Sequence, residues 1–325
     1  MIQKKNLSII IPHYNTPKLL MTAIESISRR DDFEIIVVDD NSDTSLDDLK
    51  KMIISLNRND VTIISNNSSK KGAGACRNIG LHNSRGKWIT FLDSDDYFNQ
   101  NFNEIFNEYN ESDYDTIFFT PTSIELDTRE ISTRHLAYKK ILESPSNELQ
   151  IRFCYPSPVS RFFRRSFLIS NNIEFDEVLA SNDVIFSLQV GFKMEKYKIS
   201  NRTFYVITKR KGSLTQNISE EVFFARVKTF LKKESLLREK LDKTNYKKVR
   251  EDGYGYFVIA LKNGLGLKGL LCTFRLFKEY NQKIIKLSLF KPKKLINFIK
   301  INNNFSNDKD YKVKWISKLF FHNLQ

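Results

Sequence analysis

Trp88-Ile-Thr-Phe-Leu-Asp-Ser-Asp-Asp-Tyr-Phe98 is an apolar run that ends in three carboxylates, Asp93, Asp95 and Asp96. The apolar part, residues 88–92, has the composition of a buried strand. Acidic side chains clustered at the end of such a strand repel one another unless a cation or a donor-rich ligand lies between them. Mg²⁺ and Mn²⁺ prefer oxygen ligands, and Mg²⁺ often takes one or two carboxylates together with phosphate oxygens. This stretch therefore predicts a site for a metal-bound phosphate.

A helix start is the alternative interpretation of the same stretch. Ser94 or Asp95 has the side chain of an N-cap, and the helix dipole favours carboxylates in a first turn. Such a helix would run through Phe98 and Phe102. The stretch alone leaves both interpretations open.

The composition is that of a globular protein. The 325 residues are 41% hydrophobic and 13% aromatic, enough to bury one large core or two. No window of about 18 uncharged apolar residues occurs, so a membrane-spanning helix is not expected. Cys76, Cys154 and Cys272 lack metal-site spacing and suit a reducing cytosol. A strand-like run follows the first few residues directly, so no secretory signal is expected.

The net charge of +14 is concentrated in the C-terminal third of the chain. From residue 221 onward there are 24 basic and nine acidic side chains, whereas residues 1–220 are close to neutral. A nearly neutral N-terminal part argues against nucleic acid as its ligand, and the basic C-terminal part indicates a second partner.

The first 120 residues alternate strand-like and helical patterns. Apolar runs rich in Ile, Val and Phe occur at residues 8–11, 34–38, 61–65, 88–92 and 116–120. Helical spacing occurs at residues 19–27 and 46–56, the second with Ser42 or Asp43 as the expected cap. Strand–helix–strand units of this length predict an α/β fold with a doubly wound parallel sheet.

Polar clusters follow three of the predicted strands. Pro12-His-Tyr-Asn15 follows the first, Asp39-Asp-Asn-Ser42 the second and Asp93-Ser-Asp95 the fourth. Each alone is ordinary turn chemistry. Because ligands of such sheets bind beyond the carboxyl ends of the strands, the three clusters together predict one binding site.

A basic, glycine-containing stretch at residues 70–80 precedes the fourth predicted strand. Gly72 and Gly74 would open a helix whose N–H groups face a phosphate, with Arg77 one turn in. As a dinucleotide fingerprint it is poor, because Arg77 stands where the third glycine belongs. We interpret the stretch as a phosphate or base contact; a flexible loop before a core helix is the alternative.

The middle of the chain carries fewer signals. Arg161-Phe-Phe-Arg-Arg-Ser-Phe-Leu-Ile169 predicts a helix start with Phe162 and Phe163 in the core. Ser181 or Asn182 would cap a further helix with Asp183 in its first turn, where the dipole keeps a carboxylate ionised. Residues 203–208 predict a strand, and the basic loop 209–213 that follows would close over phosphates or be solvated.

From about residue 220 the pattern is helical and basic. One apolar face is expected from Phe223, Val227, Phe230, Leu231 and Leu237. Residues 291–300 and 312–321 have the pattern of short cationic amphipathic helices with aromatic anchors. This pattern is typical of a helix on an anionic membrane surface, and packing on the rest of the chain is the equal alternative.

Taken in order, five motifs resemble those of family 2 glycosyltransferases of the GT-A fold. They are Ser8-Ile-Ile-Ile-Pro-His-Tyr-Asn15, Val37-Val-Asp-Asp-Asn-Ser42, Gly74-Ala-Cys-Arg-Asn-Ile-Gly80, Phe91-Leu-Asp-Ser-Asp-Asp96 and Asn182-Asp183. Further stretches, among them Phe175-Asp-Glu177, resemble a bacterial subgroup that builds surface polysaccharides. The resemblance implies a Rossmann-like, mostly parallel sheet flanked by helices in a catalytic domain at residues 1–215. A helical basic region would follow at residues 216–325.

The resemblance also implies roles for the nucleotide-sugar site. Tyr14 would stack on the base, with uracil expected, and Asp40 would accept a hydrogen bond from it. Arg77 would support the nucleotide. Pro12, Asn15 and Ser94 would complete the nucleotide-sugar site.

For the chemistry, the resemblance implies that Asp95 ligates Mn²⁺ or Mg²⁺ on the diphosphate and that Asp93 contacts either the donor ribose or this metal. Asp183 would be the catalytic base. Family members more often have Glu-Asp where this chain has Asn182-Asp183, which puts a role for the first residue of that pair in doubt. Arg210 and Ser213 match a loop that folds over the donor.

The implied activity is inverting transfer of a hexose from a UDP-sugar to a saccharide hydroxyl in bacterial capsule, exopolysaccharide or lipopolysaccharide synthesis. The acceptor would be linked to a lipid diphosphate, and the protein would lie in the cytoplasm, peripheral on the inner face of the plasma membrane. A homo-oligomer is left open, and nucleic acid is not expected as a partner. The alternatives are a non-catalytic nucleotide-sugar-binding scaffold at the membrane and a Rossmann NAD-dependent oxidoreductase.

Overall fold

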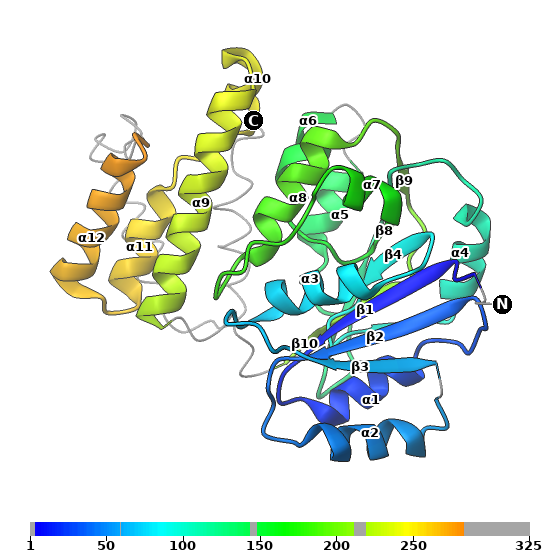
Figure 1. Cartoon of the computed structure of the whole chain (residues 1–325). Helices are drawn as coiled ribbons and strands as arrows, with labels where there is room; N and C mark the ends of the chain where they lie inside the picture. Colours follow the sequence, from blue (N-terminus) through cyan, green and yellow to red (C-terminus); the bar gives the residue numbers. More distant parts are fainter. Residues whose placement is uncertain (1–3, 59, 144–147, 211–218, 283–325) are drawn as a thin grey trace. The chain divides into compact units, whose positions relative to one another are not determined.

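The computed structural model describes residues 4–58, 60–143, 148–210 and 219–282. The chain divides into two compact units, Met1–Asn217 and Ile218–Gln325, and each has its own hydrophobic core (Figure 1).

The described part of the first unit contains a seven-stranded sheet in the order β3-β2-β1-β4-β8-β6-β9. The strands are β1 (Leu7–His13), β2 (Phe33–Asp39), β3 (Val61–Ser65), β4 (Trp88–Phe91), β6 (Thr116–Phe119), β8 (Arg161–Arg164) and β9 (Tyr197–Ser200). β1 is parallel to β2 and β4, β2 to β3, and β6 to β9, whereas β8 runs antiparallel between β4 and β6. The prediction of an α/β fold with a mostly parallel sheet is confirmed.

The expected helix start at Arg161 is wrong. Arg161–Arg164 forms the strand β8, and the helix α7 (Arg165–Ser170) begins only afterwards. Phe162 and Phe163 alternate across the sheet and are both buried, as expected of core residues. Pairing with β4 and β6, which are distant in sequence, outweighs the local helical pattern.

A second sheet of three strands, in the order β5-β10-β7, lies next to the acidic stretch. Its strands are β5 (Tyr97–Phe98), β7 (Thr122–Glu125) and β10 (Tyr205–Lys209). The helix expected to run from Ser94 or Asp95 through Phe98 is therefore absent from this part of the chain. A turn and β5 occupy the stretch, and the next helix begins at Phe102.

The helices of the first unit flank the large sheet (Figure 1). They are α1 (Pro17–Glu25), α2 (Leu46–Ser55), α3 (Ala73–Asn83), α4 (Phe102–Tyr109), α5 (Leu136–Leu142), α6 (Glu148–Cys154), α7 and α8 (Asn182–Lys193). The cap of α2 is Ser45, whose Oγ accepts the Asp48 N–H at 3.1 Å, not Ser42 or Asp43 as expected.

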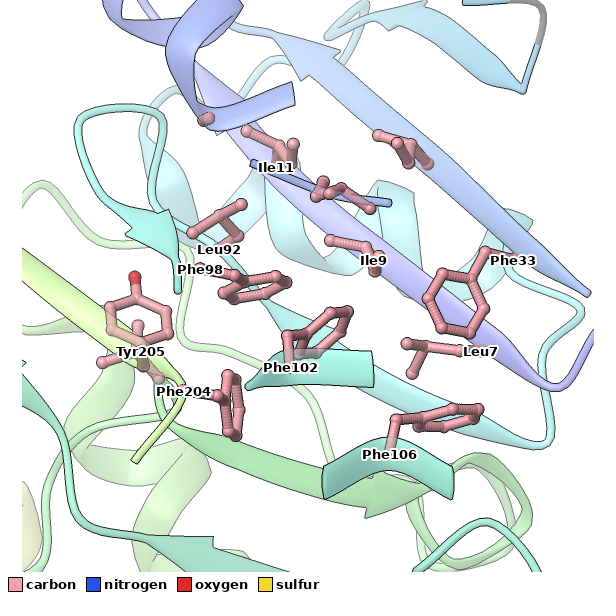
Figure 2. Packing of buried hydrophobic residues seen from close by; sticks show 14 of the residues in the cluster. Leu7, Ile9, Ile11, Phe33, Leu92, Phe98, Phe102, Phe106, Phe204 and Tyr205 are labelled. Carbon is pink, nitrogen blue, oxygen red and sulfur yellow. The ribbon is translucent and has the colours of Figure 1, made fainter. Parts of the chain in front are cut away.

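One face of the large sheet packs on a cluster of aromatic rings (Figure 2). The rings of Phe98 and Phe102 stack with centroids 4.2 Å apart, and Phe33 meets Phe106 edge-on at 5.0 Å. Aromatic pairs of this geometry add roughly 0.5–1.5 kcal/mol each beyond the area that they bury. The cluster fixes β5 and α4 against the sheet, and so fixes the acidic turn that precedes them.

The other face packs on α3 and α8. A Cβ at Gly80 would lie 2.3 Å from Ile10 Cγ2, so only glycine allows α3 to approach β1 this closely. Phe175 and Phe186 stack with centroids 3.9 Å apart beneath Phe91. This packing brings the amino ends of α3 and α8 to the carboxyl ends of the parallel strands.

The second unit is helical in its described part. The described part contains α9 (Glu220–Lys240), α10 (Lys243–Val249), α11 (Tyr254–Lys262) and α12 (Gly266–Glu279). The apolar face expected on the first helix is buried, from Phe223 to Leu237. The predicted cationic helices at residues 291–300 and 312–321 lie outside the described residues. Within the described ranges, no helix is both long and apolar enough to span a bilayer.

Candidate functional site

The three polar clusters expected from the sequence meet at one edge of the large sheet. The register pairs Pro12 with Val38 and His13 with Asp39, at the carboxyl ends of β1 and β2. β4 lies on the other side of β1, and Asp93 follows it after one residue. Pro12 is buried in β1, so any contact that it makes with a ligand would be through the main chain.

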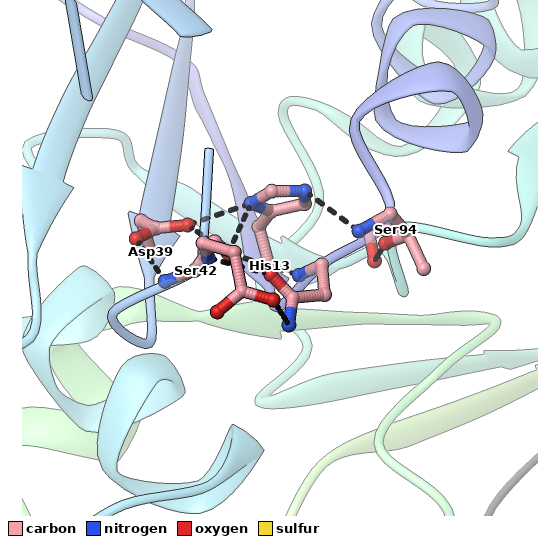
Figure 3. A network of polar contacts seen from close by, with 7 residues as sticks. His13, Asp39, Ser42 and Ser94 are labelled. Carbon is pink, nitrogen blue, oxygen red and sulfur yellow. Dashed lines mark hydrogen bonds and ion pairs between the residues drawn. The ribbon is translucent and has the colours of Figure 1, made fainter. Parts of the chain in front are cut away.

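A hydrogen-bond network that the sequence did not predict holds this edge together (Figure 3). His13 Nε2 accepts the Thr16 N–H at 3.2 Å, so the proton of the neutral ring lies on Nδ1 and is donated to Asp39 Oδ1 at 2.8 Å. Asp39 also accepts the hydroxyl of Ser42 at 2.6 Å. His13 and Asp39 are buried, and their hydrogen bonds fix the loops that follow β1 and β2.

The loop after β1 presents the first predicted contacts. Tyr14 is 57% exposed, so the face of its ring is open to a base. Asn15 has a φ of 52° and exchanges two hydrogen bonds with Asp43, at 2.7 and 2.9 Å. Ser94 Oγ lies 3.0 Å from Thr16 Oγ1, which ties this loop to the acidic turn.

Asp40 holds the glycine-containing loop in place. Its Oδ1 accepts the Asn66 side-chain amide at 2.6 Å, and its Oδ2 accepts the Gly72 N–H at 2.7 Å. Gly72 has a φ of 103°, which favours glycine at this position. The Cys76 thiol is a third hydrogen-bond partner of this carboxyl. A carboxylate has about four lone pairs, so Asp40 can still accept a hydrogen bond from a base.

Arg77 lies at the centre of the site. Its guanidinium donates to Asp93 Oδ1 at 2.5 Å and to Asn182 Oδ1 at 2.9 Å, and it lies over the ring of Phe175. Although burial opposes the charged form, Asp93 and Asp183 raise the pKa of Arg77 above its ordinary value. The Arg77 Nε is buried without a partner among the described residues. Arg77 is therefore a fixed cation between two carboxylates.

The carboxylates expected to bind a metal each keep one oxygen available. Asp95 Oδ2 accepts from Arg210 Nε at 3.0 Å, and Asp93 uses Oδ1 for Arg77. The remaining two oxygens accept no hydrogen bond from residues that the structure describes, and both side chains are partly exposed. Among the residues that the structure describes, no group of three or more acidic, histidine or cysteine side chains is placed so that it could hold a metal ion by itself. Two carboxylates fit a cation whose other ligands are phosphate oxygens and water.

Asp96, the third acid of the turn, has a structural position. It accepts the Tyr205 hydroxyl at 2.8 Å and the Thr208 N–H at 2.7 Å, and the Tyr205 oxygen accepts the Asp93 N–H at 3.1 Å. Burial, followed by the charges of Asp95 and Asp93, raises the pKa of Asp96 well above its usual range. Asp96 thus ties the acidic turn to β10.

Asp183 lies in the first turn of α8, next to Asn182. Burial raises the pKa of Asp183 to about 6, Arg77 opposes this rise, and Asp93 adds to it. A carboxyl with a pKa near neutrality is a better proton acceptor than an ordinary surface aspartate. The amino end of α8 also lies close to α3, since a Cβ at Gly74 would be 2.9 Å from Asn182 Cβ.

The structure therefore brings most of the predicted site residues to one edge of the sheet. Ser213 lies outside the described residues. The residues that sequence reasoning missed are the supporting ones, His13, Asp39, Asn66 and Tyr205. His13 and Asp39 stand within the polar clusters, whereas Tyr205 gave no signal beyond its place in a predicted strand.

Comparisons with known proteins agree on the family. The family model described as glycosyl transferase family 2 matches residues 8–170. The chain is 26% identical over 228 residues to the poly(ribitol-phosphate) beta-N-acetylglucosaminyltransferase TarS of Staphylococcus aureus, covering 67% of this chain and 38% of TarS. It is 42% identical over 94 residues to the GalNAc(5)-diNAcBac-PP-undecaprenol beta-1,3-glucosyltransferase of Campylobacter jejuni, covering 28% of this chain and 29% of that enzyme. The chain thus spans well under half the length of these relatives.

A solved structure supports the fold. The crystal structure of TarS residues 1–349 in complex with UDP-GlcNAc superimposes with a TM-score of 0.64 at 20% identity, covering 85% of this chain and 80% of that one. The match of the family model over half the chain and the agreement of the fold lead to the same conclusion. The chain belongs to glycosyl transferase family 2, and its fold is that of the GT-A glycosyltransferases.

Proposed function

We propose that this protein is an inverting glycosyltransferase that moves a hexose from a UDP-sugar to a hydroxyl of a lipid-linked saccharide. One observation carries the proposal. Arg77 is hydrogen-bonded to both Asp93 and Asn182, so the cation, the Asp93 carboxylate and the neighbouring Asp183 carboxyl meet at the edge of the sheet where ligands bind, and burial raises the pKa of Asp183 to about 6.

The donor would lie across the ends of β1, β2 and β4. The exposed ring of Tyr14 would stack on the uracil, and Asp40 would accept a hydrogen bond from it. Arg77 and Arg210 would hold the carboxylates Asp93 and Asp95 in position beneath the diphosphate. The complex of TarS with UDP-GlcNAc supports a UDP-sugar as the donor.

Asp93 and Asp95 would hold Mn²⁺ or Mg²⁺ through their remaining oxygens. When bound, the metal supplies positive charge that stabilises the leaving diphosphate. Arg210 is a further cation on the same side, and its contact with Asp95 positions it for the phosphates. With Ser213, it would belong to a loop that covers the donor.

In the proposed reaction the acceptor oxygen forms a bond to the anomeric carbon while the bond from that carbon to the phosphate oxygen breaks. The electron pair leaves with UDP, and the acceptor proton moves to Asp183. A single displacement with one base inverts the configuration. The amide of Asn182 holds Arg77 without adding a negative charge beside this base.

The acceptor and the place of action are further parts of the proposal. The name of the Campylobacter relative gives its acceptor as a saccharide on a PP-undecaprenol carrier. TarS is named as a transferase that acts on poly(ribitol-phosphate), and GgaA of Bacillus subtilis is named as a minor teichoic acid biosynthesis protein. We therefore assign residues 1–215 to catalysis in bacterial surface-polysaccharide synthesis, on the cytoplasmic face of the plasma membrane.

Two measurements test the function. In the first, the melting temperature is recorded with UDP, GDP, CMP, dTDP or NAD, each with and without Mn²⁺. UDP should stabilise the protein in a metal-dependent way, by about 2.7 kcal/mol at a hundred times its Kd. In the second, release of UDP from UDP-sugars is measured. Stabilisation by NAD alone, without any effect of metal, would contradict the proposal. Binding of UDP without any turnover of UDP-sugars would favour a non-catalytic scaffold.

A further inference from the structure

The helix α12 exposes an apolar row on the side that faces away from its own core. Leu267, Leu271 and Phe274 are 80%, 58% and 50% exposed, and their spacing of four and three residues places them on one face. Thr273 and Phe277, roughly 90–130° around the helix from this row, are buried, and Phe277 packs into the core of the second unit. The helix therefore has two apolar faces, and only one of them is covered in the described structure.

Basic side chains border this exposed row. Lys268, Arg275 and Lys278 are exposed, and in the helical repeat they lie within or beside the row. Glu279 is the one acidic residue between positions 261 and 282. We define the α12 outer face as Leu267, Leu271 and Phe274 with these three cations.

We propose that the α12 outer face docks on an anionic lipid surface. The apolar row would enter the boundary between headgroups and acyl chains, and the three cations would contact the headgroup phosphates. This inference rests on the proposed function, because an acceptor carried by a lipid has to be reached at a bilayer. It names a surface that the cationic patterns at residues 291–300 and 312–321 did not include.

Charge distinguishes lipid from the other possible occupants of this face. Residues 283–325 contain ten basic and two acidic side chains, so their charge repels that of the α12 outer face. A second copy of the face would bring the same cations together. An anionic bilayer is complementary to the cations and also accepts the apolar row.

The backbone that leads into α12 leaves room for such docking. Gly264 and Gly266 have φ values of 68° and 59°, and a Cβ at either position would meet nothing within 4 Å. Leu267, in the first turn of α12, therefore follows a loop whose two glycines have open space around them; Figure 1 shows α12 after α11 in the second unit.

The test is sedimentation of the full chain with vesicles, one set of phosphatidylcholine alone and one of phosphatidylcholine and phosphatidylglycerol in equal parts. The double variant Leu271→Ser/Phe274→Ser should bind the mixed vesicles at least about tenfold more weakly than the parent protein. The variant Lys268→Gln/Arg275→Gln should lose most of the preference for mixed vesicles and most of the sensitivity to salt. Ile54→Ser is the matched control, because Ile54 is 67% exposed on α2 and should leave binding unchanged.

Unchanged vesicle binding in both α12 variants would overturn the inference. A change of oligomeric state in those variants without a change in vesicle binding would overturn it in favour of a second copy as the occupant. Melting temperatures with UDP require no vesicles, so a failure of the docking inference is distinguishable from a failure of the proposed function. All the substituted positions are exposed, and circular dichroism verifies that the helices remain.

Discussion

Replacing Asp183 by asparagine should lower the rate of sugar transfer by about 10²–10⁴-fold, because an amide cannot take up the proton that the attacking hydroxyl of the saccharide loses. Donor binding should survive, since the Asp183 carboxyl accepts hydrogen bonds from the main-chain N–H groups of Asp183 and Val184 and does not hold Arg77 by a hydrogen bond. Asn182, which does hold Arg77, is unchanged in this variant. The variant therefore separates chemistry from binding.

The same assignment also predicts how much the activity of the parent enzyme changes with pH. Burial raises the pKa of Asp183 to about 6, and the carboxyl must be ionised to act as a base. Its ionised fraction is about nine-tenths at pH 7 and about one-tenth at pH 5. Activity should therefore fall about tenfold as the pH drops from 7 to 5, with half of the loss near pH 6.

The assay is the initial rate of transfer at limiting acceptor from pH 5 to 8, with UDP-dependent melting as the measure of donor binding. Asp47→Asn is the matched control, because Asp47 is an aspartate in the first turn of α2 with an 82% exposed side chain, and its ion pair is with Lys50 and not with a site residue. Equal activity of Asp183→Asn and its parent would remove Asp183 from the mechanism. A profile without an inflection near pH 6 would contradict the assigned base even if the variant were inactive.

Three further predictions concern the metal site and the two cores. Asp95→Asn should abolish the Mn²⁺-dependent part of the UDP-induced melting shift while leaving the unliganded protein folded; a full shift in this variant would exclude Asp95 as a ligand. Gly80→Ala should lower the stability to urea by about 1–3 kcal/mol, because the new Cβ would meet Ile10 at 2.3 Å, and an unchanged midpoint would contradict this packing. Burial raises the pKa of Glu234 from an ordinary 4.5 to about 7, so the folded state binds the proton of this carboxyl more tightly than the unfolded state does. The second unit should therefore lose up to about 3 kcal/mol of stability as the pH rises from below 4.5 to above 7. Glu234→Gln should remove this loss in urea titrations at pH 5 and 8, and a variant as pH-sensitive as its parent would refute the assignment.

The strands that the sequence predicted most directly are those in which most residues are Ile, Val, Leu or Phe. β1 and β2 are buried on both faces along their whole length, so their runs of Ile and Val carry the signal directly. The site was predictable for a related reason. The carboxyl ends of parallel strands meet at one edge, so polar residues after β1, β2 and β4 converge without any knowledge of side-chain contacts.

What the sequence did not predict depends on partners that are distant along the chain. Arg161–Arg164 has no alternating polar pattern, and it becomes a strand because β4 and β6 bind it on both edges. Asp96 resembles its neighbours Asp93 and Asp95 in sequence. Its different role follows from Tyr205, 109 residues away along the chain, whose hydroxyl donates a hydrogen bond to the Asp96 carboxyl.

The same dependence explains the role of Asn182. Arg77 is the buried cation shared by Asp93 and Asp183, and Asn182 orients it through an uncharged amide oxygen. An acid at position 182 would compete for the charge of Arg77, which would weaken its hold on Asp93. It would also place a second negative charge beside Asp183 and raise the pKa of that carboxyl further. With an amide at this position, Arg77 interacts with two carboxylates only. These are Asp93, in the proposed metal site, and Asp183, the proposed base.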